Sequence, residues 1–542
     1  MIKNKLPLIA LSVLLFVIFR QWFSFDKTLS SGDWPYLYPE NTAEFQIPTQ
    51  QPFLWIEPYY QITAKIGVEL LDLPWEVTEK IFWFIPLIFV GFFSSTFFLR
   101  YIFKDLKLGN FYIALGSLFY VANTYFLMVM GGGQLGVAFS YGLAPLTLFF
   151  LIRALREKID LKLFVLSSLT LAIQIMFDPR IFILTILIFL VYFLFHLFFD
   201  KTVRKEMITS LFGILFVSFF LNLFWIIPNF IYYQQEFSFI ATEPLASFLS
   251  FAKFENSLSL LHPNWPENIF GKVGFMKPEF IPLAIVAYIS LPFINIKNKK
   301  QALIIISFAL IGLMGSFLGK GVNPPLGGVY EFFSTLPGSS LFRDPTKFYI
   351  LTATSYSVII PLSVYYLYQI LNKRTKFLGV IFVWIFLFYI SFLLKPVFFG
   401  ELSGTFEPKK VPNEYIKFKN FITEQNEAFN YLSVPESQRF LYSSRQNSAI
   451  GVRDLFASEN IASVPAILNK NSAKKTLMEE NIKYIVVPYD LLGEIFVADR
   501  KYDNKLYIGM INSFKEFDWL QFLEENGQSE FGRIAVFEVI YK

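Results

Sequence analysis

Three short segments of the 542-residue chain carry the charged side chains best suited to chemistry. Asp33 lies in Ser30-Ser-Gly-Asp-Trp-Pro35, Asp178 in Phe177-Asp-Pro-Arg180, and Arg343 and Lys347 in Leu341-Phe-Arg-Asp-Pro-Thr-Lys347. A carboxylate beside a hydroxyl can accept its proton as a general base. A guanidinium presents a planar fork of donors that suits a phosphate, and an ammonium adds a point charge. These residue types fit acid–base chemistry and phosphate binding.

The acidic candidates also have plain structural explanations. Most loop acids are solvated or cap a helix, and Asp33 could be one of them. Asp178 and Arg180 lie between two apolar runs with almost no loop, so they could simply pair with each other. An ionisable group at membrane depth costs about 2.5–3.5 kcal/mol on insertion scales and is rarely idle. Asp178 is therefore a candidate second carboxylate, metal ligand or partner of a phosphate-binding arginine.

Arg343 and Lys347 are four residues apart, and Pro345 between them suits the first turn of a helix. On a helix start the two cations would share one face. The alternative is a pair of anchors that bind ordinary lipid headgroups at the membrane interface.

His262 and Trp265, in Leu261-His-Pro-Asn-Trp265, are candidates for binding an acceptor sugar, with loop packing as the alternative. The chain has no Cys and two His, which excludes disulfides, thiolate sites and multi-histidine metal sites. No Asp-x-Asp or Glu-x-Asp pair occurs in the first loop, so no metal is predicted strongly there, although a divalent metal stays possible. The net charge of +5 comes from scattered basic clusters, unlike a nucleic-acid groove.

Long apolar runs must position these residues. Hydrophobic residues make up 54% of the chain and charged residues 16%, too few charges to cover a soluble protein of this size. Each run is long enough to cross about 30 Å of hydrocarbon. We expect roughly eleven transmembrane helices, near 6–25, 80–103, 109–130, 136–153, 161–177, 181–199, 208–229, 280–295, 301–319, 347–371 and 376–398.

Basic residues cluster before the first run and in every second short connection, for example at Arg100, Arg156, Lys300 and Arg374. The positive-inside rule places these connections and the N-terminus in the cytoplasm, and an odd number of spans puts the C-terminus outside. The first run could instead be a signal peptide, but no small-residue cleavage site follows it. The chain lacks Asn-x-Ser/Thr sequons, which favours a prokaryotic plasma membrane.

The predicted outer loops are 26–78, 230–279 and 320–346. Within the first, apolar residues from Tyr59 to Leu70 recur at helical spacing, which predicts an amphipathic helix on the membrane surface. After Gly400 charges become frequent, and we predict an extracytoplasmic small α/β domain over 400–542. Its expected elements are helices at 413–430 and 472–480 and strands at 439–443, 483–488 and 533–540.

An acid just past the first span, followed by a long loop with a surface helix, resembles the GT-C superfamily of membrane glycosyltransferases. Phe342-Arg-Asp-Pro-Thr-Lys-Phe348, Gly132-Gly-Gln134 and Lys483-Tyr-Ile-Val-Val487 look like elements of arabinofuranosyltransferases and YfhO-like membrane proteins. The resemblance covers most of the chain in architecture.

This resemblance implies transfer of a sugar from a polyprenyl-phosphate donor to a cell-envelope glycan, lipid or protein acceptor on the outer face. Asp33 would be the general base, and Arg180, Arg343 and Lys347 would bind the lipid phosphate. The alternative is a non-catalytic membrane carrier or assembly factor for envelope polymers or lipids, including a degenerate scaffold of the same fold. A signal receptor is a weaker third reading, since nothing resembles a cytoplasmic effector domain.

Overall fold

The computed structural model divides the chain into two compact units. Unit 1 comprises residues 1–23, 47–60 and 80–406, and unit 2 comprises 24–46, 61–79 and 407–542. The structure describes residues 2–42, 44, 56–199, 205–232, 247–274, 276–399, 406–434, 438–456, 461–488, 504–525 and 528–541. Parts of the predicted loops 26–78 and 230–279, and the predicted domain boundary at 400, lie outside them.

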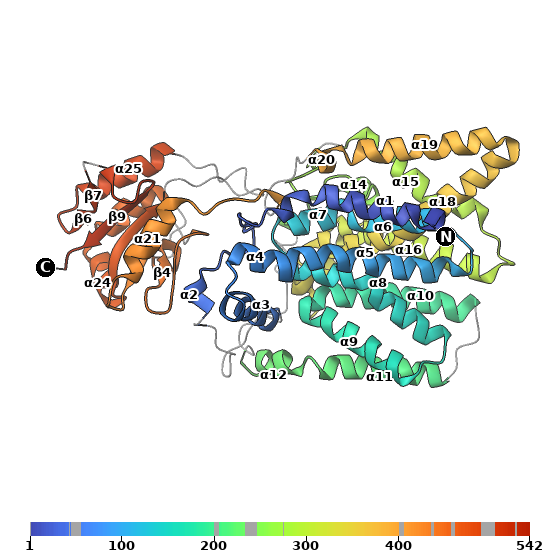
Figure 1. Cartoon of the computed structure of the whole chain (residues 1–542), viewed down its shortest axis with the longest axis horizontal. Helices are drawn as coiled ribbons and strands as arrows, with labels where there is room; N and C mark the ends of the chain where they lie inside the picture. Colours follow the sequence, from blue (N-terminus) through green and yellow to red (C-terminus); the bar gives the residue numbers. More distant parts are fainter. Residues whose placement is uncertain are drawn as a thin grey trace. The chain divides into compact units, whose positions relative to one another are not determined.

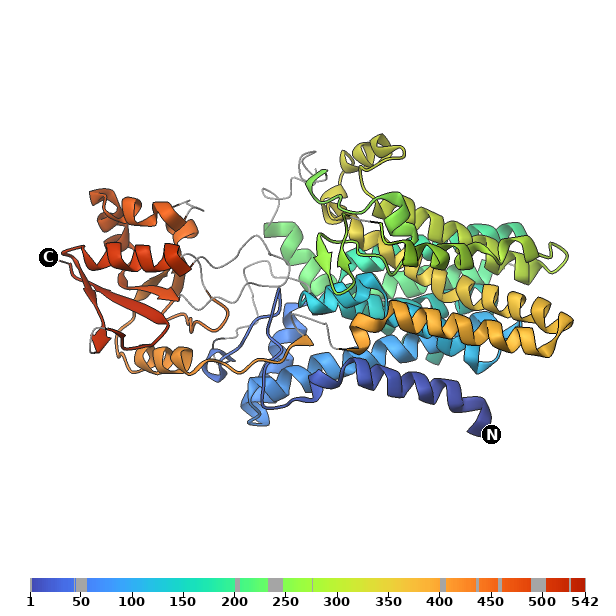
Figure 2. The ribbon, with the colours of Figure 1, turned by 90° about the horizontal axis from the view of Figure 1, so that it is seen from above.

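Unit 1 is a bundle of long apolar helices (Figures 1 and 2). Inside a bilayer every backbone amide needs an internal partner, so uninterrupted apolar runs become helices. All eleven predicted segments are helical. The helices are α1 (Ile2–Ile18), α5 (Ile85–Lys104), α6 (Asn110–Val121), α7 (Thr124–Gly131), α8 (Leu135–Arg156), α9 (Leu161–Phe177), α10 (Pro179–Phe199), α11 (Lys205–Phe220), α12 (Leu223–Tyr232), α15 (Ile281–Tyr288), α16 (Lys299–Gly319), α18 (Tyr349–Arg374) and α19 (Lys376–Leu393).

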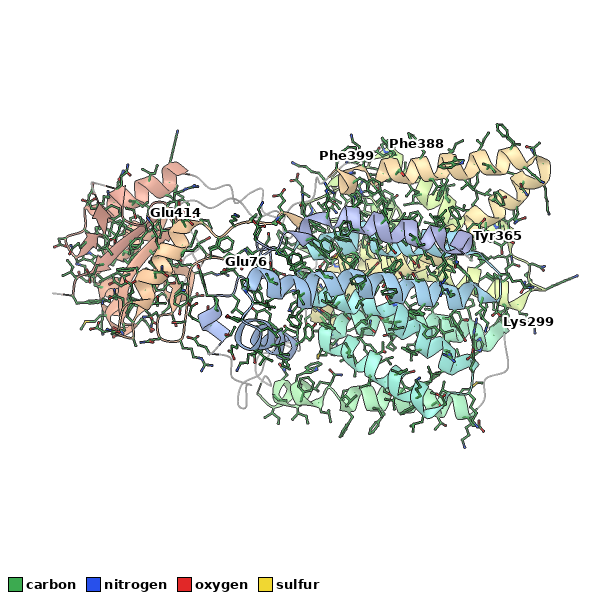
Figure 3. The ribbon with its side chains drawn as sticks, viewed as in Figure 1. Glu76, Lys299, Tyr365, Phe388, Phe399 and Glu414 are labelled. Atoms are coloured by element: carbon green, nitrogen blue, oxygen red, sulfur yellow. The ribbon has the colours of Figure 1, made fainter. Side chains whose placement is uncertain are left out.

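Within the described residues, six helices are long and apolar enough to cross a membrane, or up to eight if each bent pair counts as one span. The multi-pass architecture is confirmed, and the count of eleven stays a prediction. Side chains such as Phe388 on α19, 76% exposed, point away from the bundle as lipid-facing residues do (Figure 3).

Two predicted single spans are broken, and each break carries an asparagine. The α6–α7 pair bends by 47° and the α11–α12 pair by 62°. Asn123 caps α7 by accepting the backbone N–H groups of Tyr125 and Phe126 at 3.1 and 3.0 Å. Asn222 bonds across to the carbonyl of Ala172 at 3.1 Å and accepts the Trp225 indole N–H at 2.7 Å. A short polar side chain here replaces the backbone bonds that the bend removes.

The bundle centre is α16 packed on α18, whose residues from Tyr349 to Val364 are all buried. Small residues allow the close approach: a Cβ at Gly312 or Gly315 would collide with Ser355 or Thr352 of α18. Small residues at the contact are expected between helices in a bilayer, because the hydrophobic effect does not drive their association there and close packing does.

The predicted basic connections gather at one end of the bundle, which we call the basic end. Asp105, after α5, pairs with Arg156 at the end of α8 and with Lys300 at the start of α16, at 3.5 and 3.0 Å. Figure 1 shows the N-terminus at the same end. The connections α7–α8 and α9–α10 and the segment 320–348 therefore lie at the opposite end, which we call the turn end.

Unit 2 contains a five-stranded mixed sheet in the order β4-β3-β5-β9-β6. The strands β3 (Asn430–Ser433), β4 (Ala449–Gly451) and β5 (Ile482–Pro488) are parallel, and β9 (Ile534–Val539) runs antiparallel to both β5 and β6 (Leu520–Phe522). Helix α21 (Asn413–Thr423) covers one face, and α23 (Val464–Leu468), α24 (Asn471–Glu479) and α25 (Asn504–Lys515) cover the other. A strand buried on both faces explains the apolar run at 483–488.

The predicted strands at 483–488 and 533–540 and the helix at 472–480 are confirmed, and the helix predicted at 413–430 ends at Thr423. The strand predicted at 439–443 is wrong, because these residues form turns that contact the first loop. Unit 2 also differs from the predicted domain by including residues 24–46 and 61–79. Tyr38 packs into the core beside Tyr415 and Tyr431, so the first loop is part of this fold.

The predicted surface helix is present as α3 (Glu57–Ala64) followed by a π-helix, Lys65–Leu70. Ile62, Ile66 and Leu70 are exposed, as the amphipathic pattern requires. Their place on a membrane surface stays a prediction.

Candidate active site

The Asp33 turn, residues 29–34 of unit 2, presents an exposed carboxylate on a tightly held backbone. Gly32 has a φ of +59°, a left-handed conformation that glycine adopts without strain. The Trp34 N–H closes the turn onto the Ser31 carbonyl at 3.0 Å. Ser30 donates to the Pro35 carbonyl at 2.8 Å, so both sides of the turn are fixed. Asp33 itself is exposed at the tip.

A buried acid holds the turn from one side. The Glu79 carboxylate, at 0% exposure, accepts the Leu29 backbone N–H at 2.6 Å and the Trp34 indole N–H at 2.9 Å. The Trp34 ring stacks on Trp75 at 5.8 Å between centroids. Glu79 therefore forms hydrogen bonds with the chain both before and after Asp33.

Arg439 holds the turn from the other side. Its guanidinium donates to the Gly32 carbonyl at 2.7 Å and also to the Trp34 carbonyl. The planar fork suits two neighbouring acceptors. The residues on both sides of Asp33 are thus bonded to one side chain from the C-terminal part of the chain.

The same part of unit 2 contains the half-buried Tyr36 and the buried Tyr38. Burial, with Glu76 nearby, raises the pKa of the Tyr36 hydroxyl, which stays neutral and donates to Glu76 at 3.2 Å. Tyr38 donates to the Phe440 carbonyl at 2.7 Å, and Thr28 forms an antiparallel bridge with Lys409. The turn is thereby joined to the C-terminal domain at several points.

The second predicted acid, Asp178, is in unit 1 at the turn end. Its side chain is 1% exposed and pairs with Arg180, whose Nη2 lies 2.5 Å from Oδ2. Its Oδ1 also accepts the backbone N–H groups of Arg180 and Ile181 at 2.8 and 3.2 Å, which caps α10. Ser140 of α8 donates to the Asp178 carbonyl at 3.0 Å. The pairing considered from the sequence is confirmed, and it coincides with a helix cap.

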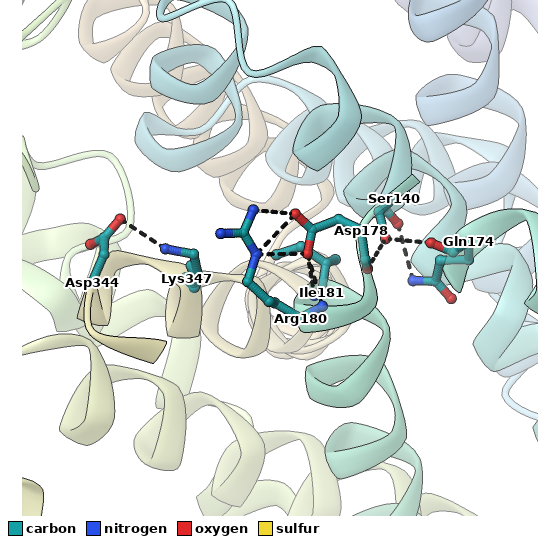
Figure 4. A network of polar contacts seen from close by, with 7 residues as sticks. All are labelled: Ser140, Gln174, Asp178, Arg180, Ile181, Asp344 and Lys347. Atoms are coloured by element: carbon teal, nitrogen blue, oxygen red, sulfur yellow. Dashed lines mark hydrogen bonds and ion pairs between the residues drawn. The ribbon is translucent and has the colours of Figure 1, made fainter. Parts of the chain in front are cut away.

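Lys347 has a similar partner, Asp344, at 3.3 Å. Asp344 is also the N-cap of the 3₁₀ helix Pro345–Phe348, accepting the Thr346 backbone N–H at 3.0 Å. Figure 4 shows the Lys347 ammonium and the Arg180 guanidinium facing each other between the two carboxylates. Lys347 interacts electrostatically with Arg180, Asp178 and Asp344. We call these four residues the turn-end charge cluster.

Tyr125 joins this cluster from α7. Its hydroxyl is buried and has no hydrogen-bond partner within the described part of the chain. It interacts electrostatically with Asp344, Asp178 and Arg180. Sequence reasoning missed it because Tyr125 lies inside an apolar run with no charge nearby. Asp344 was visible in the segment around Arg343, but no role was predicted for it.

Arg343 departs from its prediction. Because the helix begins at Pro345, Arg343 lies before it and does not share a face with Lys347: Arg343 is exposed, whereas Lys347 is 8% exposed. Among the described residues Arg343 has no acidic partner. It is therefore a cation at the turn end that is open to a further anion.

His262 is fully buried in unit 1, where its ring accepts the Lys277 backbone N–H at 3.2 Å and lies 2.9 Å from the Asn256 amide. These bonds favour the loop-packing alternative. Trp265 is half-buried against Phe251. Within the described ranges no three Asp, Glu or His side chains gather as a metal-binding group.

The structure thus brings Asp178, Arg180 and Lys347 together, with Arg343 a few residues before Lys347 in the chain. His262 and Trp265 belong to the same unit, whereas Asp33 belongs to unit 2. A single site that combines Asp33 with the turn-end charge cluster stays a prediction.

The sequence matches no known protein-family profile and no curated protein. Solved structures do share its fold. The arabinofuranosyltransferase AftD from Mycobacteria aligns over 99% of this chain at a TM-score of 0.59 and 14% identity. The oligosaccharyltransferase AglB from Archaeoglobus fulgidus aligns over 90% at 0.52 and 11% identity. The chain spans 40% of the length of AftD and 70% of that of AglB.

Proposed function

From this GT-C-type membrane fold, we propose that the chain is a glycosyltransferase. It moves a sugar from a polyprenyl-phosphate donor to a glycan, lipid or protein acceptor of the cell envelope, with inversion at the anomeric carbon. The observation that carries the proposal is the alignment with a sugar-transferring enzyme along nearly the whole chain. AglB, the second structure, is complexed with dolichol-phosphate, a polyprenyl phosphate, which supports this donor class.

The proposed reaction is a single displacement. The acceptor hydroxyl forms a bond to the anomeric carbon, and the Asp33 carboxylate takes its proton. The bond from that carbon to the phosphate oxygen breaks, and the lipid phosphate leaves with the electron pair. Cations stabilise the charge that grows on the leaving oxygen.

Among the cations of unit 1, Arg343 is the first candidate for this role because it is exposed without an acidic partner among the described residues. Arg180 and Lys347 already have carboxylate partners at 2.5 and 3.3 Å. A phosphate would share Arg180 and Lys347 with these carboxylates. Asp178 and Asp344 would then keep the two cations in place. The Tyr125 hydroxyl offers one further donor.

A transfer assay tests the proposal. Purified full-length protein is incubated with polyprenyl-phosphate sugars and membrane extracts from cells that lack it, and labelled sugar in the product is measured. Transfer with inverted anomeric configuration supports the proposal. No transfer from any donor, together with tight binding of envelope polymers or lipids, would favour the non-catalytic carrier.

Arg439 should act as a positioning residue for Asp33. We expect Arg439→Ala to lower kcat for transfer about tenfold, since removing two charge-assisted bonds costs about 1.5–3 kcal/mol each and a small misplacement of a catalytic group slows catalysis. The KM for the donor should stay the same, because the turn would move while the cations of unit 1 stay in place.

Two further variants complete this test. Arg439→Lys should recover part of the loss, since an ammonium can satisfy one of the two carbonyls. Arg445→Ala, at an exposed arginine of the same region, is the matched control and should behave like the parent. An unchanged kcat in Arg439→Ala would contradict the positioning role.

The proposed site requires the turn end and unit 2 to face outward from a plasma membrane, with the N-terminus in the cytoplasm. The chain has no cysteine, so single cysteines can report the side of each segment. A membrane-impermeant maleimide should label Ser472→Cys in intact cells, because Ser472 is exposed in unit 2. Lys297→Cys, exposed in the connection before α16, should react only after permeabilisation. The reverse labelling pattern would mean that the chain has the opposite orientation in the membrane.

A further inference from the structure

A polar cavity lies at the basic end of unit 1, at the opposite end of the bundle from the turn-end charge cluster. Its volume is about 290 Å³, near the lower limit of the ~300–1,000 Å³ typical of ligand pockets. It is therefore sized for a small polar group rather than for a whole lipid or nucleotide. Its charged lining consists of Lys104, Asp105, Arg156, Glu157, Lys299 and Lys300.

The acids of the cavity are already engaged. Asp105 pairs with both Arg156 and Lys300. Glu157 accepts from Arg153 at 3.0 Å and from the Tyr101 hydroxyl at 3.2 Å. Arg156 is also held in place, since its guanidinium bonds the Tyr192 hydroxyl and lies 5.6 Å from the centre of that ring. These contacts join α5, α8, α10 and α16 into a fixed frame.

Two cations of the lining remain without an acidic partner among the described residues, Lys104 and Lys299. Both are exposed, and Figure 3 shows Lys299 at this end of the bundle. Lys299 and Lys300 start α16, where backbone N–H groups add positive potential. Four basic residues face two acids, so the lining has an excess of positive charge. A small anion would satisfy the two lysines without disturbing the frame.

We propose that this cavity is a phosphate-binding site, occupied by the headgroup phosphate of an anionic membrane lipid. The basic end is the one predicted to face the cytoplasm, where anionic lipids attract basic side chains at the membrane surface. A soluble phosphate shares the same chemistry, and the experiment separates the two sources. The proposal concerns the end away from the candidate active site and does not depend on the proposed reaction.

The test measures binding to purified full-length protein by native mass spectrometry and by thermal stabilisation. The probes are phosphatidylglycerol, phosphatidylcholine and inorganic phosphate. The test variant is Lys104→Gln/Lys299→Gln. The matched control is Lys297→Gln/Lys376→Gln, which removes two exposed lysines at the same end that do not line the cavity.

We expect the parent to prefer phosphatidylglycerol over phosphatidylcholine. The test variant should lose about tenfold or more in apparent affinity, given the contribution of each basic residue near an anionic surface. The control should stay within about twofold of the parent, because its lysines contribute only diffuse attraction that salt screens.

Competition with inorganic phosphate distinguishes a lipid headgroup from a soluble phosphate as the ligand. Binding of phosphatidylglycerol that phosphate does not displace supports the lipid headgroup. Stabilisation by phosphate alone, lost in the test variant, supports a soluble ligand at the same site. Equal losses in the test and control variants, or equal binding of the two lipids by the parent, would overturn the site.

Discussion

Replacing Asp33 by Asn is expected to lower kcat for sugar transfer by at least about 100-fold. General base catalysis contributes roughly 10²–10⁴-fold, and an amide of the same shape cannot take the proton from the acceptor hydroxyl. The turn should keep its bonds to Arg439, because these bonds are made to the backbone carbonyls of Gly32 and Trp34. Initial rates and the thermal midpoint of purified protein, measured together, check both expectations.

Asp26→Asn is the matched control for this prediction. Asp26 is another exposed acid of the first loop, paired with Lys410 at 3.5 Å, and its substitution should leave the rate within about twofold, as for other surface ion pairs. If Asp33→Asn transfers as fast as the parent while Asp26→Asn does too, Asp33 is not the base.

Asp178→Ala is expected to destabilise the protein by about 3 kcal/mol. Removing one partner of a buried ion pair costs about 3–5 kcal/mol, and the low end applies because the Arg180 side chain is 27% exposed. The variant leaves two adjacent cations, Arg180 and Lys347, of which only Lys347 keeps a carboxylate partner within the cluster, Asp344. It also removes the cap of α10. The shift in denaturant midpoint measures the loss.

The double variant Asp178→Ala/Arg180→Ala separates charge from packing. It should recover much of the stability, since it removes the uncompensated charge that the single variant creates. Glu267→Ala breaks an exposed pair with Lys272 at 4.0 Å and should cost less than about 1 kcal/mol. A single Asp178 variant as stable as Glu267→Ala would mean that the turn-end charge cluster does not hold the bundle together.

The helices were predictable because a bilayer leaves an apolar run few other choices. The breaks were not, because a single asparagine such as Asn123 or Asn222 decides them, and its effect depends on which carbonyls lie within reach. Likewise the Asp178–Arg180 pair could be predicted from two neighbouring positions, whereas Asp344 and Tyr125 come from other helices and meet the pair only after folding.

The residues of the candidate site also divide into those that the sequence could predict and those that it could not. Asp33 could be chosen from its place after the first span. Arg439 and Glu79, which hold its turn, could not, because no local pattern links residues that are 407 or 50 positions away in sequence. The alternating apolar residues at 439–443 predicted a strand, which hid the role of Arg439. In the structure the aromatic residues of this segment pack onto Tyr36 and Tyr38 and form no strand.

The two hydrogen bonds from Arg439 to the Asp33 turn can form only late in synthesis, after Arg439 itself has been made. The turn leaves the ribosome 407 residues before the Gly32 carbonyl can find its donor, about 20–80 s at ordinary rates of translation. Every helix of the bundle after α1 is synthesised in that interval. A nascent or truncated chain that ends before Arg439 would therefore hold its helical bundle, its aspartate and the Glu79 bonds to the turn, but not the two bonds from Arg439.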